Sequence, residues 1–337
     1  MNQPTVPTVE EISGAARYAP FLTGRYEVKA ALASLGTDFG NGDADQHVFQ
    51  LDDSFAAFRA NKLLARAERR SKYDARSPAF ADPIAAAVTA FTARRLAAEH
   101  PRDFALDKSA CGAALACHRS GETLRFDDAW QLTAASSSPP SSPPYADGFD
   151  ALMCQVQEDV AVVVRQDDGG DEVGAIHLCA ANHWGAEDKI GQSFFHIHQV
   201  VPGMEPVNRK AAQMVDAMID RGPFVRFVWG IATDTRLNHH PEPAPGCPQD
   251  VWHGRRFDAA DPRLFVRVER QVLWGLPEVG AVLFAIRPSF RDGVAVRADA
   301  ELNQALQRSL ASMTPEQAHY KGVADSRDGV LAWLRGD

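Results

Sequence analysis

The sequence predicts an α+β fold in which an antiparallel sheet of about five strands carries helices against one face. Three observations lead to this prediction. Two strong helix signals lie before residue 133, a Ser/Pro-rich segment follows, and apolar runs typical of strands are prominent in the rest of the chain. We expect a mainly helical N-terminal region at 1–133 packed on the core, a linker at 134–148 and a sheet region at 149–337.

Two helices are predicted in the N-terminal region. Ser54–Arg70 is rich in Ala, Leu and Arg and gathers its large apolar residues on one side. Asp82–Glu99 has an Asp at its start, Pro83 in the first turn and a His-Pro stop after its last residue. The remaining predicted helices are Pro206–Arg221, Ala298–Ser312 and Arg327–Leu334.

The predicted strands all follow the Ser/Pro-rich segment. The first two are separated by Asp167–Gly170, an Asp-Asp-Gly-Gly sequence typical of a hairpin turn. The last two are joined at Leu276-Pro277. The five predicted strands are Val160–Arg165, Val173–Ala181, Phe224–Ile231, Leu264–Trp274 and Ala281–Arg287.

Composition excludes several classes of protein. The chain has 35 basic and 44 acidic residues, a net charge of −9, and no block of Lys and Arg, so we expect no binding to nucleic acid. Its apolar runs are too short to span a membrane, and Met1–Ser13 is too polar for a signal peptide. The five cysteines include no C-x-x-C pair, which argues against a zinc knuckle and covalent haem and favours a cytoplasmic protein.

A stretch rich in histidine is the strongest chemical signal. His177, His183, His196 and His198 lie within about thirty residues, and imidazole is the commonest metal ligand and proton carrier near neutral pH. On an extended chain, His196 and His198 would lie on one side, as in a cupin-like metal site. The carboxylate and glycine spacings of a cupin are not met, however, because Glu205 follows too late.

Charged residues within apolar strands are the second signal. Arg226 is a single Arg in an apolar strand and needs a buried anionic partner or a route to water. Arg267, Glu269 and Gln271 alternate along one strand face, as a carboxylate clamp or as a solvated outer face. Glu158 precedes a strand and is either a pocket carboxylate for an amine or an ordinary strand-start residue.

Taken in order, several motifs resemble the family of haem-dependent oxidative N-demethylases, alpha-subunit-like. The likeness covers nearly the whole chain. The motifs are Val156–Val160, Trp184 with Glu187–Gly191, Ile197-His198 with Val201-Pro202, Arg226 with Trp229, Arg267 with Glu269–Gln271, Leu276-Pro277, and Tyr320–Gly322.

The resemblance implies a PAS-like fold that binds b-type haem without a covalent bond. It implies that His198 ligates the iron and that Lys189, Arg226, Arg267 and Trp184 contact the cofactor. The implied activity is a monooxygenase reaction, in which O2 and electrons from a separate flavin and iron–sulfur reductase remove an N-methyl group from a small amine. On this reading Glu158 is the catalytic carboxylate that holds the substrate amine.

Two alternatives remain open at the level of sequence. A haem-binding PAS module could sense gas or redox state without turnover. A cupin-like oxygenase could instead use His196 and His198 to hold iron without porphyrin.

Overall fold

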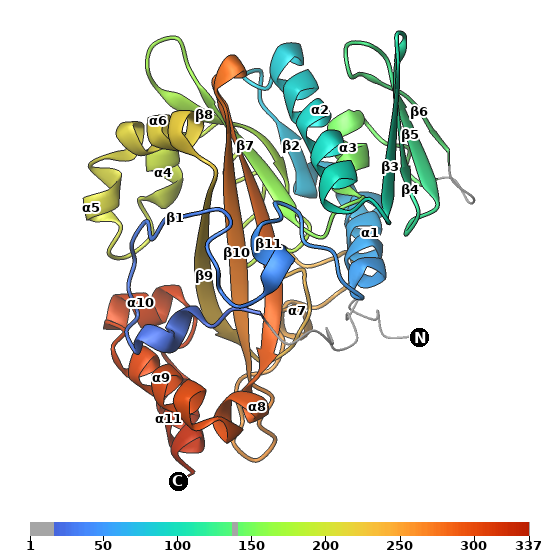
Figure 1. Ribbon diagram of the computed structural model, residues 1–337. Coiled ribbons are helices and arrows are strands. Elements are labelled where there is room, and N and C mark those ends of the chain that lie inside the picture. Colours follow the sequence, from blue (N-terminus) through green and yellow to red (C-terminus); the bar gives the residue numbers. More distant parts are fainter. Residues whose placement is uncertain (1–16, 137–140, 337) are drawn as a thin grey trace.

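The computed structural model describes residues 17–136 and 141–336, and in this part of the chain two antiparallel sheets are packed among helices (Figure 1). The central sheet has seven strands in the order β1-β9-β10-β11-β7-β8-β2. Its strands are β1 (Ala33–Ser34), β2 (Asp74–Arg76), β7 (Asp159–Arg165), β8 (Asp171–His177), β9 (Phe224–Ala232), β10 (Phe265–Leu276) and β11 (Ala281–Asp292). The α+β class is confirmed, but the count of about five strands is too low, and helices cover both faces of the sheet and not one. The five predicted strands form the contiguous block β9-β10-β11-β7-β8, which two short strands extend at its edges.

The register of the central sheet assigns side chains to two faces. Arg226 on β9 lies opposite Gln271 on β10, which lies opposite Ile286 on β11, so these three side chains share one face. Val225, Val272 and Ala285, one residue away in each strand, share the other face. We call the first the α6 face and the second the N-terminal face, after the elements that cover them.

The two faces are covered by different parts of the chain (Figure 1). On the N-terminal face, Val225, Val272 and Ala285 pack in one core with residues of the N-terminal helices and of α3. On the α6 face, Leu273 and Val282 pack with helix α6. The helices concerned are α1 (Phe55–Tyr73), α2 (Asp82–Glu99), α3 (Gly148–Met153), α4 (Phe194–His198), α5 (Glu205–Asn208) and α6 (Ala211–Arg221).

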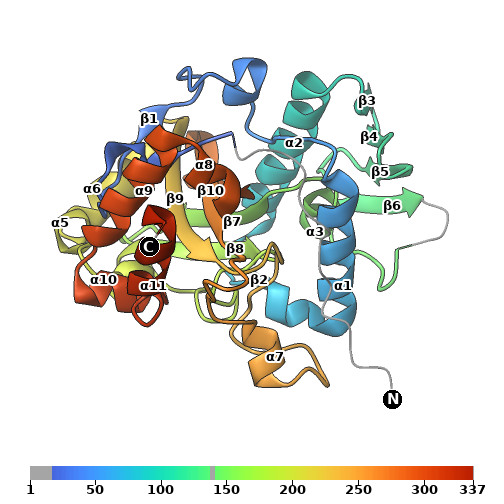
Figure 2. The same ribbon diagram turned by 90° about the horizontal axis from the view of Figure 1, so that it is seen from below.

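The C-terminal helices close one end of the sheet, as the view from below shows (Figure 2). They bury a separate apolar cluster that includes Trp229 and Phe21. Helix α9 packs on the 3-10 helix Pro20–Thr23, so the start of the described chain lies against its end. The remaining helices are α7 (Gln249–His253), α8 (Gly293–Ala298), α9 (Ala300–Ala311), α10 (Pro315–Tyr320) and α11 (Arg327–Arg335).

The N-terminal region contains a second sheet that the sequence did not predict. Its four antiparallel strands are β3 (Phe104–Ser109), β4 (Gly112–Cys117), β5 (Glu122–Phe126) and β6 (Leu132–Ser136). The expectation of a mainly helical region at 1–133 is therefore wrong in this part. The outer strands β3 and β6 are mostly exposed and contain Ala, Ser and charged residues, so they lack the apolar alternation that identifies a strand.

Two local predictions also need correction. His196 and His198 do not lie on an extended chain but in the short helix α4, which Ser193 caps by accepting a hydrogen bond from the His196 backbone N–H. The predicted helix Pro206–Arg221 is two helices, α5 and α6, separated at Arg209 and Lys210. Among the described residues, no helix is both long and apolar enough to cross a membrane.

Part of the predicted Ser/Pro-rich linker is fixed on helix α1. The Arg66 guanidinium donates hydrogen bonds to Ser141 Oγ (3.2 Å) and to the Pro144 carbonyl (3.1 Å). Asp147 then caps α3 by accepting a hydrogen bond from the Asp150 backbone N–H. Residues 137–140 of the linker, and the polar segment Met1–Ser13, lie outside the described residues.

Candidate functional site

Three charged residues lie together on the α6 face of the central sheet. Arg226 projects from β9, and Arg267 and Glu269 project from the neighbouring strand β10. An Arg267 Nη lies 3.6 Å from a Glu269 carboxylate oxygen. Arg226 and Glu269 remain only half-buried although they occupy central strands, so this part of the face is less completely covered than the apolar part beneath α6.

The two guanidinium groups differ in how they are held. Arg267 is buried and donates hydrogen bonds to the carbonyls of Ala180 (2.6 Å) and Leu237 (3.2 Å). Arg226 has a single long hydrogen bond, 3.4 Å to the Lys29 carbonyl. Burial lowers the pKa of both groups, and Glu269 opposes that shift. Because Arg226 has no carboxylate within 4.0 Å in the described residues, it is the better placed of the two to bind an external anion.

Lys321 adds a further positive charge that the sequence did not assign to the site. It follows the end of helix α10, and its side chain lies over Gly230 of β9, where an added Cβ would meet Lys321 Cδ at 4.0 Å. Burial lowers the pKa of Lys321, with Glu269 opposing and Arg226 and Arg267 reinforcing the shift. The only signal in the sequence was its place in the Tyr320–Gly322 motif, which carried no role.

His198 reaches the same face from helix α4. Its Nδ1 lies 2.7 Å from the Phe194 carbonyl oxygen one turn earlier, so Nδ1 carries the proton and Nε2 keeps its lone pair. Burial lowers the pKa of His198 to about 4; the bond to Phe194 opposes this, and Arg226 and Lys189 lower it further. The ring is therefore neutral near pH 7.

Lys189 lies beside His198 and completes the positive cluster. Its Nζ donates a hydrogen bond to the Ile197 carbonyl (3.2 Å), which ties the loop before α4 to the helix. Burial lowers the pKa of Lys189. Trp184 is half-buried in the apolar cluster beneath α6, together with Phe194 and Ile197. We call Lys189, Arg226, Arg267 and Lys321 the cationic row.

His196 does not act as a partner of His198. Two residues on a helix are about 200° apart around the axis, so the two imidazoles diverge. His196 is also exposed, whereas His198 is half-buried. The paired ligands of a cupin-like site, which depended on an extended chain, are not formed.

Glu158 lies away from this cluster, on the side of the sheet that the N-terminal region covers. One carboxylate oxygen accepts a hydrogen bond from the Gln50 backbone N–H (2.7 Å), and the other has no partner in the described residues. Burial raises the pKa of Glu158 to about 7, while Arg287, the Gln50 bond and Lys62 oppose the shift. The structure therefore does not bring Glu158 together with His198 or the cationic row.

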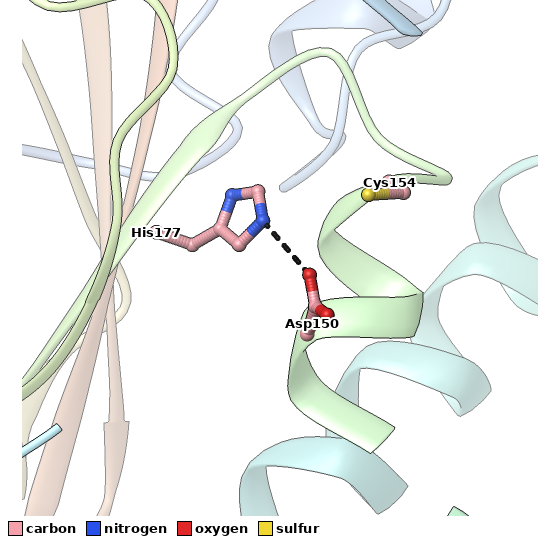
Figure 3. A group of neighbouring side chains, drawn as sticks. All are labelled: Asp150, Cys154 and His177. Carbon is pink, nitrogen blue, oxygen red and sulfur yellow. Dashed lines mark ion pairs between the residues drawn. The ribbon is translucent and has the colours of Figure 1, made fainter. Parts of the chain in front are cut away.

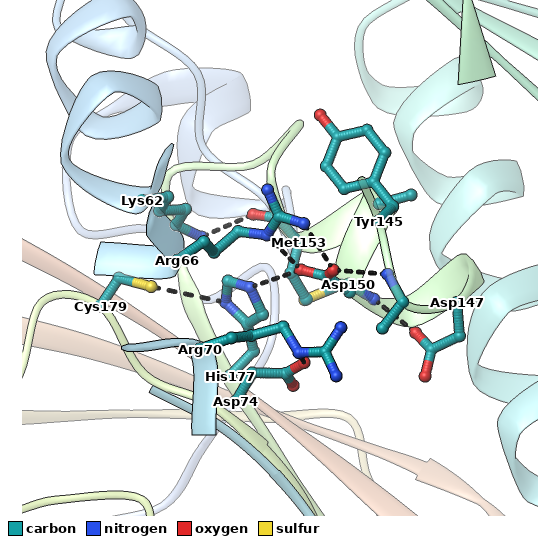
Figure 4. Close-up of polar contacts among 12 residues, drawn as sticks. Lys62, Arg66, Arg70, Asp74, Tyr145, Asp147, Asp150, Met153, His177 and Cys179 are labelled. Carbon is teal, nitrogen blue, oxygen red and sulfur yellow. Dashed lines mark hydrogen bonds and ion pairs between the residues drawn. The ribbon is translucent and has the colours of Figure 1, made fainter. Parts of the chain in front are cut away.

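A second group of reactive residue types is buried between helix α3 and the end of strand β8. Asp150, Cys154 and His177 place potential metal-ligand atoms within 4.8 Å of one another (Figure 3). A Cys-His-Asp order typical of a catalytic triad is also present (Figure 4). Cys179 Sγ lies 3.8 Å from His177 Nδ1, and His177 Nε2 lies 3.5 Å from Asp150 Oδ1.

This buried group is a structural network and not a catalytic or metal site. The Arg66 guanidinium binds both oxygens of Asp150, at 2.7 and 2.9 Å, so a permanent positive charge occupies the place of a metal ion (Figure 4). Hydrogen bonds from His177 and Arg66 lower the pKa of Asp150 although burial raises it. Burial raises the pKa of Cys179 well above its usual value, and the thiol is inaccessible to any substrate.

A comparison with known families gives a match over most of the chain. Residues 41–331 match the sequence profile of the family described as haem-dependent oxidative N-demethylase, alpha subunit-like. The matched segment contains Lys189, His198, Arg226, Arg267 and Lys321, so it spans all the residues gathered on the α6 face. The chain belongs to the haem-dependent oxidative N-demethylase, alpha-subunit-like family.

Proposed function

We propose that this protein is a haem-dependent oxygenase that removes an N-methyl group from a small amine, with His198 as the axial ligand of haem b. The tautomer and the neutral charge of the His198 ring are the observations that support the proposal. A metal-bound histidine almost always donates its other ring N–H to a carbonyl or carboxylate. His198 already donates its Nδ1–H to the Phe194 carbonyl oxygen, at 2.7 Å. The ring is neutral, so the lone pair of Nε2 is free to bind iron.

The cationic row fits the propionates of haem. Arg226, Lys189 and Lys321 are partly buried, and each lacks a carboxylate within 4.0 Å in the described residues. A buried charge without a partner is costly, so such a group favours an anionic ligand. Two propionates would supply that charge, and a guanidinium binds a carboxylate through two parallel hydrogen bonds.

The proposed reaction consumes an N-methyl amine, O2, two electrons and two protons, and it releases the demethylated amine, formaldehyde and water. Haem, when bound, supplies the oxygen chemistry. His198 would hold it through Nε2, and the cationic row would fix its orientation. The electrons would come from a separate flavin and iron–sulfur reductase, as the family resemblance implies.

We further propose that the strand block β9-β10-β11-β7-β8 forms a PAS-like haem-binding region within residues 149–337. The N-terminal region at 1–133 would support it from the opposite face, and residues 134–148 would connect the two. We propose a structural role for Glu158 instead of contact with the substrate amine, and its hydrogen bond from the Gln50 backbone N–H supports this.

The absorption spectrum of the purified protein tests the proposal. A Soret band that shifts on reduction with dithionite and again on addition of carbon monoxide is expected, because a single axial histidine leaves the other side of the iron open. Oxygen consumption that depends on an added N-methyl amine and an electron donor would distinguish an enzyme from a sensor. Absence of a Soret band after expression with haem supplied would contradict the proposal.

A further inference from the structure

His183 has an unusual backbone conformation next to the cationic row. Its φ is +64°, in the left-handed region that residues with a Cβ rarely adopt. Two hydrogen bonds hold it there: His183 N–H to the His239 carbonyl (3.0 Å) and His239 N–H to the Ala181 carbonyl (2.9 Å). Non-glycine residues kept in this region are concentrated at functional sites.

Both ring nitrogens of the neighbouring histidine, His239, already have partners. Its Nε2 lies 3.0 Å from Asp234 Oδ1, and its Nδ1 lies 3.4 Å from an Arg267 Nη. Arginine is always a donor, so Nδ1 accepts and Nε2 carries the proton that Asp234 accepts. Neither nitrogen of His239 is free to bind another molecule.

The ring nitrogens of His183, unlike those of His239, have no hydrogen-bond partner in the described residues. Its ring packs on the His239 ring, with centroids 5.5 Å apart, and in residues 17–136 and 141–336 neither of its ring nitrogens has a hydrogen-bond partner. Part of the residue is open to solvent, and the rest is covered by its neighbours. Burial lowers the pKa of His183 to about 4, with His239 and Arg267 reinforcing the shift, so the ring is neutral.

His183 and His198 lie near different members of the cationic row. His183 packs on the ring of His239, whose Nδ1 contacts Arg267, whereas the charges of Arg226 and Lys189 act on His198. Arg226 lies opposite Gln271, four residues along β10 from Arg267, which is roughly 13 Å on an extended strand. The charges around His183 include Arg236 and Arg267, which disfavour a second metal ion and favour an anionic or dipolar ligand.

We propose that His183 is a ligand-contacting residue that hydrogen-bonds a small anionic or dipolar molecule bound on the α6 face, at the end of the cationic row away from His198. The inference deepens the proposed function and rests on it, since the molecule concerned would be a ligand of the haem iron such as O2. The hydrogen bonds made in such a pocket decide whether O2 is only bound or also activated.

Azide binding to the ferric protein tests this assignment. We would titrate the full-length haem protein with azide and follow the Soret band in the wild type and in His183→Asn, His183→Gly and His196→Asn. Loss of one hydrogen bond to a charged ligand should weaken azide binding about tenfold in both His183 variants. His196→Asn, on the same histidine-rich stretch but exposed on α4, is the matched control and should bind azide as the wild type does.

The thermal stability of the haem-free proteins separates a ligand contact from a structural role. Glycine and asparagine tolerate the left-handed conformation, so both His183 variants should unfold at the wild-type temperature or above it. Azide affinity within twofold of wild type in both His183 variants, with normal haem content, would overturn this inference alone. A wild-type protein without haem would overturn the proposed function as well.

Discussion

The Nδ1 atom of His198 lies 2.7 Å from the carbonyl oxygen of Phe194, one helical turn earlier in α4. The two rings also pack together, with centroids 4.2 Å apart. Helix α4 thus fixes both the tautomer and the orientation of the imidazole before any ligand arrives. The short helix is therefore the part of the structure that makes His198 a metal ligand in our proposal.

His198→Ala should purify as a folded protein without haem, because the substitution removes the proposed iron ligand but few apolar contacts. The ratio of Soret to protein absorbance measures the haem content. His196→Ala, an exposed substitution in the same helix, should keep full haem. The reverse pattern, with haem lost in His196→Ala and kept in His198→Ala, would move the ligand to His196.

Lys321→Met and Arg226→Met should weaken haem binding, since each removes a positive charge that we assign to a propionate. Comparison of haem with its dimethyl ester gives the sharper measurement. The ester has no propionate charge, so both variants should bind it as well as the wild type does. An equal loss of affinity for haem and for the ester would mean that these residues support the fold and do not bind propionate.

The buried pair of Arg66 and Asp150 should be essential for stability. Removal of one partner of a buried ion pair leaves an uncompensated charge and costs about 3–5 kcal/mol of unfolding free energy. Urea denaturation of Arg66→Met measures the effect. Arg69→Met is the control on the same helix, because the ion pair of Arg69 with Glu242 is exposed and its loss should change little.

Glu158 should make the protein less stable as the pH rises. Its pKa is about 7 in the folded protein and 4.5 as the ordinary value, so between these pH values the folded state holds a proton that the unfolded state has released. Stability from this group is present below pH 4.5 and declines as the pH rises towards 7. In Glu158→Gln the urea midpoint should lose this decline, and an unchanged decline would assign it to another group.

Local sequence signals were sufficient for the long elements. Helix α2 has the predicted bounds, Asp82–Glu99, because Pro83 and the His-Pro stop act within the segment itself. The five long strands were predicted from their own apolar runs, and together they form one uninterrupted block of the sheet. The position of Arg226 within a strand was also predicted from the sequence, because Arg226 is the one charged residue in an apolar run.

Patterns within the chain were enough to predict the α+β class, the long strands and the residues able to bind a cofactor. Which of these residues lie together depends on how distant segments pack. Strand register put Arg226, Glu269 and Arg267 on one face, and the packing of the N-terminal region put Glu158 on the other. Lys321, which follows the distant helix α10, lies against the same face at Gly230. Secondary structure follows from neighbours in the chain, whereas face and register depend on pairing between segments far apart, which no local pattern records.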